Sequence, residues 1–331
     1  MRSGMRGRMV AGVAALALVL TACGGAPSDQ AAPAAAPTTG RAAQRPICGW
    51  TARPPATWKH VIWIWMENHD YQQVVGNPDA PYENRTLIAG CGLATNYHNV
   101  THPSLPNYLA ATSGARLDIG DCGPDACPTA SESLFGQLSA AGKEWRAYQE
   151  SMPANCAHQD SGAYAARHNP PVYYTRIAAD CARWDVPMGD DSGNLARDLR
   201  GDRLPAFAFI TPNLCNDTHD CPVRSGDQWL ATWVPRILAS PAYQAGTTVV
   251  LLTWDEGEGG GSNDCATDTR TPGCHVPAIV VSPATPAGTR SGTLFNHYSL
   301  LETTELLLGL RPALGHAADP ATRDMRRAFN L

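Results

Sequence analysis

The chain has 331 residues, of which 44% are hydrophobic and 17% charged, and its formal net charge is −5. This composition is typical of a globular protein and excludes a largely disordered or collagen-like chain. There is no long basic run, so a nucleic-acid partner held through its phosphates is not expected. The length suits one large α/β domain or two smaller ones.

The N-terminal region has the features of an export signal. Three arginines precede an apolar run at 9–20 that is too short to span a bilayer, which predicts a signal peptide over residues 1–22. The following Leu-Thr-Ala-Cys resembles a bacterial lipobox and predicts a lipid on Cys23 that attaches the protein to the membrane. An ordinary signal peptide cut elsewhere is the alternative. Residues 23–46, rich in Ala and Pro, are expected to form a flexible linker, and residues 47–331 the folded domain.

Cysteine usage also indicates an extracytoplasmic protein. The chain has 11 cysteines, more than a reduced cytosolic protein usually carries. If Cys23 is acylated, an even number remains, as a set of disulfides requires, although sequence alone does not fix their connectivity. A zinc site is the alternative, and the absence of a C-x-x-C pair argues against it. Pairing neighbours along the chain gives Cys48–Cys91, Cys122–Cys127, Cys156–Cys181, Cys215–Cys221 and Cys265–Cys274.

Apolar strand candidates alternate with helix candidates along the folded part. The continuous apolar run at 61–66 predicts a strand that is buried on both faces. The alternation is typical of a mostly parallel sheet with helices on both sides. In chain order we expect helices at 106–112 and 131–141, strands at 145–148 and 206–210, a helix at 227–239 capped by Ser225 or Asp227, strands at 248–253 and 276–281, and a helix at 298–308.

Polar side chains follow three of the predicted strands. Ligands bind beyond the carboxyl ends of strands in open parallel sheets, so these side chains are expected at one edge. Carboxylates packed together repel each other unless a cation neutralises them, and oxygen ligands suit Ca²⁺, Mg²⁺ or Mn²⁺. Strand-end caps and solvated loop charges are the alternative. The residues are Glu67 and Asn68 after 61–66, Asp217 and His219 after 206–210, and Asp255 and Glu256 after 248–253.

Ser104 lies at the predicted start of a helix, next to prolines at 103 and 106. Free backbone N–H groups at a helix N-terminus attract anions, so a serine there could attack phosphorus while these groups hold the phosphoryl oxygens. A helix N-cap is the simpler interpretation of Ser104 taken alone. No G-x-S-x-G motif is present to suggest a serine esterase of the α/β-hydrolase type.

Five short motifs occur in order between about 60 and 310. They are Glu67-Asn68-His69-x-Tyr71, His102-Pro103-Ser104-x-Pro106-Asn107-Tyr108, Pro212-Asn213-x-x-Asn216-Asp217-x-His219, Trp254-Asp255-Glu256-Gly257 and His297-Tyr298-Ser299. Together they resemble the bacterial phosphoesterase family of acid phosphatases and non-specific phospholipases C, within the alkaline-phosphatase-like superfamily. The resemblance implies a three-layer α/β sandwich with a mostly parallel sheet, helices on both faces and long disulfide-stapled loops.

The resemblance also implies roles for individual residues. Ser104 would be the nucleophile that is transiently phosphorylated, with Asp217 and His219 as orienter and as acid or stabiliser, and His297 as a further catalytic residue. One divalent ion (Ca²⁺, Mg²⁺, Mn²⁺ or Zn²⁺) is expected as cofactor. Its ligands would be Glu67, Asn68, Ser104, Asp255 and Glu256.

The function expected from this set is metal-dependent hydrolysis of phosphoric esters, as in an acid-phosphatase-like monoesterase. Its substrate would be a small phosphate ester or a phospholipid, met outside the cytoplasm by a membrane-attached or secreted protein. A phosphodiesterase or phospholipase C acting on phospholipid head groups is one alternative. A non-enzymatic surface-binding lipoprotein is another, and the oligomeric state stays open.

Overall fold

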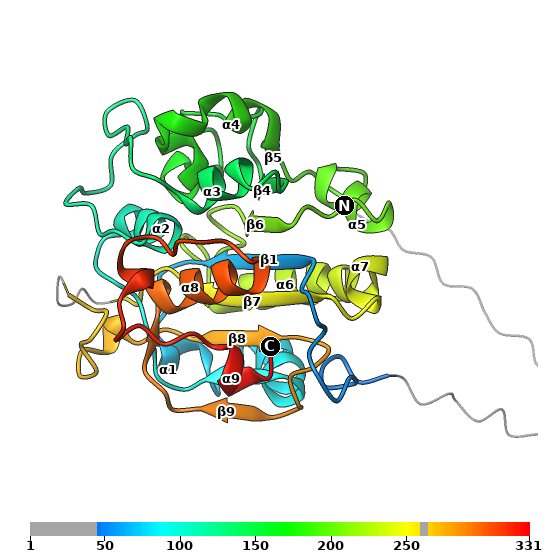
Figure 1. Cartoon of the computed structure of the whole chain (residues 1–331). Coiled ribbons are helices and arrows are strands. Elements are labelled where there is room, and N and C mark those ends of the chain that lie inside the picture. The colour runs from blue at the N-terminus through cyan, green and yellow to red at the C-terminus, as the bar shows by residue number, and fades with distance from the viewer. Residues whose placement is uncertain (1–44, 259–263) are drawn as a thin grey trace, which may run out of the picture. The chain divides into compact units, whose positions relative to one another are not determined.

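The protein is described by a computed structural model over residues 45–258 and 264–331, drawn in colour in Figure 1. The predicted signal peptide, Cys23 and the linker as far as residue 44 lie outside the described residues. Residues Arg45–Leu331 group into one unit by their internal contacts. No helix within the described ranges is long and apolar enough to cross a membrane.

The described strands include every strand expected from the sequence and several short ones in addition. They are β1 (His60–Met66), β2 (Gly92–Ala94), β3 (Tyr97–His98), β4 (Trp145–Gln149), β5 (Asp185–Pro187), β6 (Phe207–Thr211), β7 (Thr248–Trp254), β8 (Ala278–Val281), β9 (Thr289–Ser291) and β10 (Phe295–Asn296).

The helices vary from single turns to the long helix α6. They are α1 (Tyr71–Val74), α2 (Ser104–Ser113), α3 (Leu134–Ala140), α4 (Ala178–Trp184), α5 (Asn194–Arg200), α6 (Val223–Ala239), α7 (Pro241–Gln244), α8 (His297–Leu308) and α9 (Arg326–Phe329). A π-helical segment η1 (Glu83–Ile88) and the 3₁₀ turns η2 (Ala166–His168), η3 (Pro170–Tyr173), η4 (Thr175–Ile177), η5 (Pro272–Cys274) and η6 (Gly315–Ala318) complete them.

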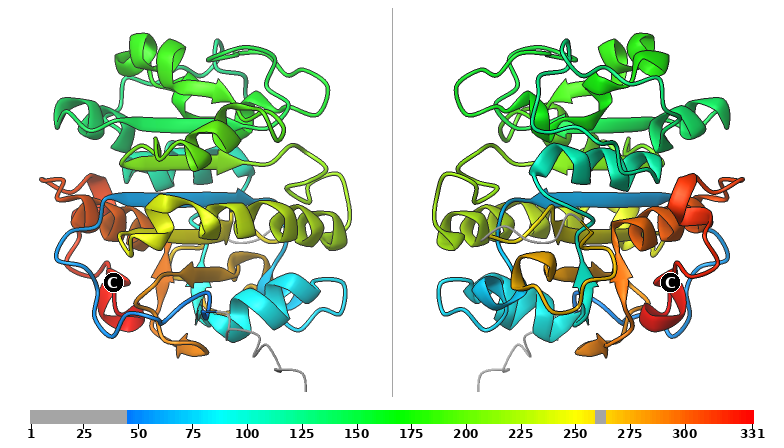
Figure 2. Two further views of the ribbon diagram at one scale, coloured as in Figure 1. Left: turned by 90° about the vertical axis from the view of Figure 1, so that its right-hand side faces the viewer. Right: turned by 90° about the vertical axis from the view of Figure 1, so that its left-hand side faces the viewer.

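Eight strands form the main sheet, in the order β5-β4-β6-β1-β7-β8-β2-β9, and β10 pairs with β3 in a small second sheet. The strands from β5 to β7 are all parallel to their neighbours. β8 runs antiparallel to both β7 and β2. The mostly parallel sheet expected from the sequence is therefore confirmed, with β8 as the exception. Figure 2 shows β1 in blue near the middle of the strands, with β4 and β5 on one side and β8 and β9 on the other.

Alternating side chains of β1 contact helices on opposite faces of the sheet, as the pleat of a strand requires. The Trp63 indole donates to Thr304 on α8 over 2.9 Å, and Trp65 packs against Tyr108 on α2 at 5.4 Å between ring centroids. Met66 points the other way, towards α6, where its methyl group lies close to Gly226. In Figure 1, α8 accordingly lies in front of β1 and β7, and α6 behind them.

Five disulfides staple the long loops, in the neighbour pairing expected from the sequence. They are Cys48–Cys91, Cys122–Cys127, Cys156–Cys181, Cys215–Cys221 and Cys265–Cys274. The competing interpretation of these cysteines as a zinc site is thus excluded for these ten sulfurs, because each is bonded to another sulfur.

Two predicted helix starts are wrong. The long helix α6 begins at Val223 after Pro222, and neither Ser225 nor Asp227 caps it. The Asp227 carboxylate instead accepts hydrogen bonds from the backbone N–H groups of Tyr82 and Glu83, so it caps η1 from across the fold. Helix α2 begins at Ser104 itself with Pro103 in the N-cap position, so Ser104 is the first helical residue and not the cap.

The loop after β7 leaves no room for a side chain at Gly257. A Cβ on Gly257 would come within 2.8 Å of the Asp70 Cβ and 3.0 Å of the Gly273 Cα. We expect Gly257→Ala to lower the melting temperature by about 2–6 °C, because overpacking costs about 1–3 kcal/mol. Differential scanning calorimetry measures this. Gly292→Ala is the matched control, since its Cβ would meet only Thr95 Oγ1 at 3.8 Å. Equal melting temperatures for both variants would contradict the packing described.

Candidate active site

The three central strands of the sheet deliver the predicted residues to one edge. β1 lies between β6 and β7, and all three are parallel, so the segments that follow them emerge side by side. Backbone hydrogen bonds continue past the strand ends. The Glu67 N–H donates to the Asp217 carbonyl over 2.8 Å, and the Asp255 N–H donates to the Met66 carbonyl over 3.0 Å. Glu67, Asp217 and Asp255 are thereby held in one cluster.

Ser104 brings its hydroxyl to this cluster from the first turn of α2. Its Oγ lies 3.2 Å from Glu67 Oε2 and 3.4 Å from Asn68 Oδ1. The Asn68 N–H donates to Asp255 Oδ1 over 3.1 Å, and Asn68 adopts a left-handed backbone with φ of 48°. The Ser104 hydroxyl thus lies among residues that directly follow β1 and β7 and are 36 and more positions away in the sequence. This is the juxtaposition on which the sequence interpretation depended.

Asn107 fixes the turn that leads into α2. Its Oδ1 accepts from the backbone N–H groups of Val100 and Thr101, and its Nδ2 donates to the Thr101 carbonyl. The same Nδ2 lies 3.3 Å from Glu256 Oε2, which connects the turn to the segment after β7.

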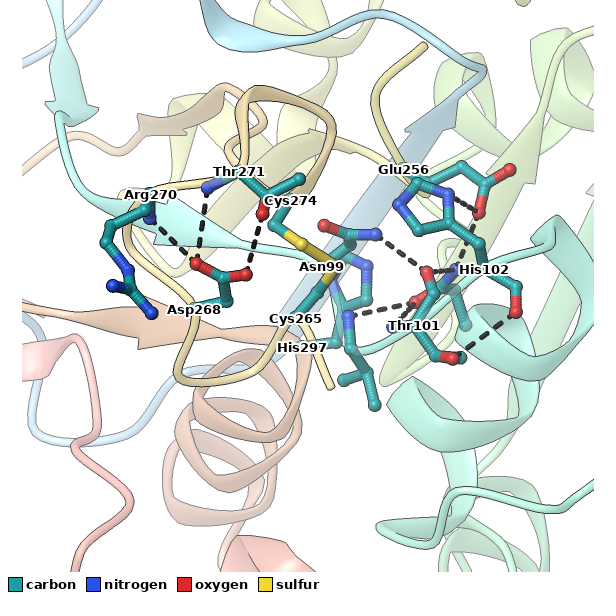
Figure 3. Close-up of a disulfide and its surroundings, with 12 residues drawn as sticks. Asn99, Thr101, His102, Glu256, Cys265, Asp268, Arg270, Thr271, Cys274 and His297 are labelled. Carbon is teal, nitrogen blue, oxygen red and sulfur yellow. Dashed lines mark hydrogen bonds and ion pairs between the residues drawn. A yellow bond between two sulfur atoms is a disulfide. The ribbon is translucent and has the colours of Figure 1, made fainter. Parts of the chain in front are cut away.

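Glu256 has a different neighbour from the one expected. Its Oε2 lies 2.8 Å from His102 Nδ1 (Figure 3), and its other contact among the described residues is the one with Asn107. Figure 3 also shows the Cys265–Cys274 disulfide beside this pair. His102 therefore contacts a predicted metal ligand, and burial lowers the pKa of its imidazole.

The structure adds two residues to the site that the sequence did not single out for these roles. The Tyr108 hydroxyl donates to Glu67 Oε1. The His168 ring stacks on Tyr108 with 5° between the planes, and it lies between two carboxylates, with Nε2 3.3 Å from Glu67 Oε1 and Nδ1 3.3 Å from Asp217 Oδ2. His168 comes from η2, deep in the long loop after the predicted strand at 145–148 and not directly behind the strand end, so no local sequence signal marks it.

Burial and mutual repulsion govern the charge of this cluster. Glu67, Asp217 and Asp255 are fully buried, and Glu256 nearly so. Burial, reinforced by the Glu256 carboxylate, raises the pKa of Asp255 to about 8. Burial raises the pKa of Asp217 to about 8, and burial together with Asp121 does the same for the pKa of Glu256. Burial and the Asp255 and Asp217 carboxylates raise the pKa of Glu67 well above its usual value.

The donor set fits a divalent cation. Asp255 Oδ2 is buried and has no hydrogen-bond partner among the described residues. Buried carboxylates of this kind are stabilised by a cation, and carboxylate, amide and hydroxyl oxygens are hard ligands. Glu67, His168 and Asp217 also place possible ligand atoms within 4.8 Å of one another.

The predicted polar pair lies at the border of the cluster. Asp217 Oδ1 accepts from the His219 backbone N–H over 2.8 Å. The His219 ring uses Nδ1 for Asp220 at 2.6 Å, and its Nε2 lies 3.2 Å from Arg167 Nη2. Because a guanidinium can only donate, Nε2 is the accepting nitrogen in this contact. Asp217 therefore orients the segment, and His219 presents its ring beside Arg167.

His297 contacts the backbone of Asp255, next to the carboxylate cluster. Its Nε2 donates to the Asp255 carbonyl over 2.7 Å, and its Nδ1 accepts from the Tyr97 hydroxyl at 2.9 Å. The ring is fully buried and packs on Trp65 at 4.9 Å between centroids, and burial lowers its pKa to about 4. Both nitrogens of a neutral His297 are thus used to hold the backbone of Asp255.

One of the N-terminal amides of α2 already has an anionic partner. The Leu105 N–H donates to Asp121 Oδ1 over 2.9 Å. Pro106 has no N–H, so the first turn offers fewer free amides for phosphoryl oxygens than the sequence suggested. A bound phosphoryl group would share this amide with Asp121 or take its place.

A protein-family model described as the Phosphoesterase family matches residues 77–311. The chain belongs to this family. The chain is similar to the acid phosphatase of Aspergillus fumigatus, with 30% identity over 76% of this chain and 55% of that enzyme. The phosphatidylinositol-3-phosphatase of Mycobacterium tuberculosis is 29% identical over 83% of this chain and 84% of its own length. Phospholipase C A of the same organism is 26% identical over 72% of this chain and 53% of its own.

The chain spans little more than half of the length of the fungal acid phosphatases that it matches, 55% and 58% in two cases. Its fold is that of the alkaline phosphatase superfamily. A member from Vibrio parahaemolyticus superposes with a TM-score of 0.52 at 12% identity, over 83% of this chain and 73% of the other. The expected α/β fold with a mostly parallel sheet is thus confirmed.

The buried carboxylates make the stability of the metal-free protein depend on pH. Asp255 and Glu256 titrate near 8 in the folded chain, against 3.8 and 4.5 as ordinary values. The folded chain retains protons that the unfolded chain has lost, so stability should fall as pH rises from about 4 to 8. In excess chelator we expect the melting temperature at pH 8 to lie at least about 3 °C below that at pH 5.

A divalent cation should reverse this difference, because it replaces the protons as counter-charge. The melting temperature, followed by differential scanning fluorimetry with Mg²⁺, Ca²⁺, Mn²⁺ or Zn²⁺, should rise more at pH 8 than at pH 5. Glu144→Gln, at a partly exposed carboxylate on the far end of β4, serves as the control that should leave the difference unchanged. No cation effect at either pH would argue against a metal site here.

Proposed function

We propose that this phosphoesterase hydrolyses phosphoric esters with Ser104 as its nucleophile, acting on phosphate monoesters in the manner of acid phosphatases. The observation that carries the proposal is the Ser104 hydroxyl at 3.2 Å from Glu67 and 3.4 Å from Asn68, in a cluster of buried carboxylates. The similarity to named phosphatases over most of this chain supports it.

The metal would be one divalent ion, held by the residues predicted from the sequence. When bound, it supplies positive charge that lowers the pKa of a serine hydroxyl and neutralises charge on phosphoryl oxygens. The proposed ligands are Glu67, Asn68, Ser104, Asp255 and Glu256.

The residues around Ser104 accept its proton and assist the leaving group in the proposed reaction. The Ser104 hydroxyl donates to Glu67 Oε2, which is therefore the nearest acceptor for its proton. Ser104 Oγ then forms a bond to phosphorus while the bond to the ester oxygen breaks, and the alcohol leaves with a proton. Water hydrolyses the phosphoserine and regenerates the hydroxyl. His219, oriented through Asp217, is the proposed acid or stabiliser on the leaving-group side.

We assign His297 a positioning role in place of the direct catalytic role first expected. Its two nitrogens are bonded to Tyr97 and to the Asp255 carbonyl, which leaves neither for a substrate. Its contribution is to fix the backbone that carries Asp255.

A phosphodiesterase or phospholipase C activity is the second candidate, because the chain is also similar to phospholipase C A. A panel of aryl phosphate, bis-aryl phosphate and phosphatidylcholine at equal concentrations separates the two. The proposal predicts that the monoester is turned over fastest. A protein that hydrolyses none of the three with any divalent ion would favour a surface-binding lipoprotein.

We further propose that the protein works outside the cytoplasm, held to the membrane by lipid on Cys23 or released as a secreted form. The five disulfides support this location, because such bonds persist in oxidising compartments.

Substituting the nucleophile tests the covalent mechanism. Ser104→Ala should lower kcat for an aryl phosphate at least about 10³-fold, because no other hydroxyl replaces Oγ. Acid quenching of the wild-type reaction should yield a phosphorylated peptide containing Ser104, detected by mass spectrometry. Ser113→Ala removes a buried hydroxyl at the other end of α2 and should keep most of the activity. Near wild-type turnover by Ser104→Ala would refute the mechanism.

A further inference from the structure

A cleft of about 470 Å³ opens beside the candidate active site. Its volume lies within the range of ligand-binding pockets. It is bounded by two loops that sequence analysis left without a role, one around the Cys122–Cys127 disulfide and one that precedes η2. The side chains that matter are Asp121, His158, Gln159, Asp160, Arg167 and Tyr173.

Two of these residues connect the cleft directly to the proposed chemistry. Asp121 binds the N–H of Leu105, the residue that follows Ser104. Arg167 reaches His219 at 3.2 Å, on the side of the site assigned to the leaving group. A group attached to a phosphoryl at Ser104 could therefore extend between Asp121 and Arg167.

A second recess, beside His102, is smaller. It has about 180 Å³ and is lined by Pro106, Leu117 and Ile119 among others. That volume is below the usual range for a ligand pocket. The larger cleft is therefore the better candidate for the alcohol part of a substrate.

The polar side chains of the cleft are held in place by the fold. Asp160 Oδ1 accepts from the Ala166 N–H over 2.7 Å, and the Tyr173 hydroxyl donates to the Cys122 carbonyl over 2.7 Å. On the outer rim, Asp125 accepts from Gln159 Nε2 at 3.0 Å and pairs with His158 Nδ1 at 2.7 Å. Fixed polar groups cost less to order when a ligand binds.

The Leu105 N–H occupies one carboxylate oxygen of Asp121, and the Ala166 N–H occupies one carboxylate oxygen of Asp160. The second oxygen of each can accept from a ligand, while the Arg167 guanidinium donates several N–H groups. The charges of all three act on Tyr173, whose pKa burial raises, with the two carboxylates adding to the rise and Arg167 opposing it. The cleft thus offers acceptors and donors close together, and its lining includes Tyr173 and Ala166.

This chemistry selects among leaving groups. Two carboxylates repel an anionic alcohol, such as one that carries a second phosphate. A hydrocarbon leaving group makes no hydrogen bonds with these side chains and so gains no affinity from them. A neutral alcohol with several hydroxyls can donate to the carboxylates and accept from the guanidinium.

Resting on the proposed function, we propose that this cleft is a leaving-group subsite for hydroxyl-rich alcohols, so that the preferred substrates are phosphate monoesters of polyols or sugars. Asp160 and Arg167 are its main recognition residues. Asp121 separates the subsite from the phosphoryl position.

The test compares sorbitol 6-phosphate with hexyl phosphate, two six-carbon monoesters that differ in the hydroxyls of the leaving group. The wild-type enzyme, with its divalent ion, should show kcat/KM at least about tenfold higher for sorbitol 6-phosphate. Asp160→Asn keeps the oxygen that accepts from Ala166 and removes the negative charge. It should lower kcat/KM for sorbitol 6-phosphate about tenfold and change that for hexyl phosphate by less than about twofold.

Asp191→Asn is the matched control, because this carboxylate is exposed and pairs with Arg236 of α6, away from the cleft. It should leave both substrates unchanged. Equal kcat/KM for the two substrates in the wild type, or an unchanged preference in Asp160→Asn, would overturn the subsite. The wild-type comparison decides the matter even if Asp160→Asn is unstable. Absence of hydrolysis of both esters and of an aryl phosphate would instead refute the proposed function.

Discussion

Electrostatic repulsion among buried carboxylates is the main constraint on this protein. These carboxylates lie at one edge of the sheet, in the segments that follow three parallel strands. Glu67, Asp217 and Asp255 are buried at the ends of β1, β6 and β7, where water cannot screen their charges. Such a cluster is stable only if protons or a cation balance it. The neighbouring side chains follow from this constraint. Tyr108 donates to one of these carboxylates and His168 lies between two of them.

Much of the fold was predictable because its strongest signals are local. The apolar run of β1 has no polar alternation, which identifies a strand covered on both faces, and the β6 and β7 runs are similar. Parallel strands end at the same edge, so the residues directly after them could be grouped without knowing any long-range contact. The disulfides were also within reach, because four of the five pairs are separated by 25 or fewer positions.

The rest is determined by contacts between distant segments, which no local pattern reveals. Asp227 was predicted as a cap of its own helix, yet it lies inside α6 and its carboxylate caps η1, about 145 positions away. His168 comes from a long loop without strand or helix periodicity, and only the packing of η2 against α2 brings it to Glu67. Glu256 was grouped with the metal ligands, and its pairing with His102 depends on how the turn before α2 folds.

The central claim is that Ser104 Oγ shares one cation with carboxylates from two strands. A crystal structure of the protein grown with Mn²⁺, with anomalous diffraction recorded at the manganese edge, tests it most directly. The account predicts one strong anomalous peak within about 2.6 Å of oxygens from Glu67, Asn68, Ser104, Asp255 and Glu256. A peak found only between Glu67, His168 and Asp217, or none in the cluster, would contradict the account.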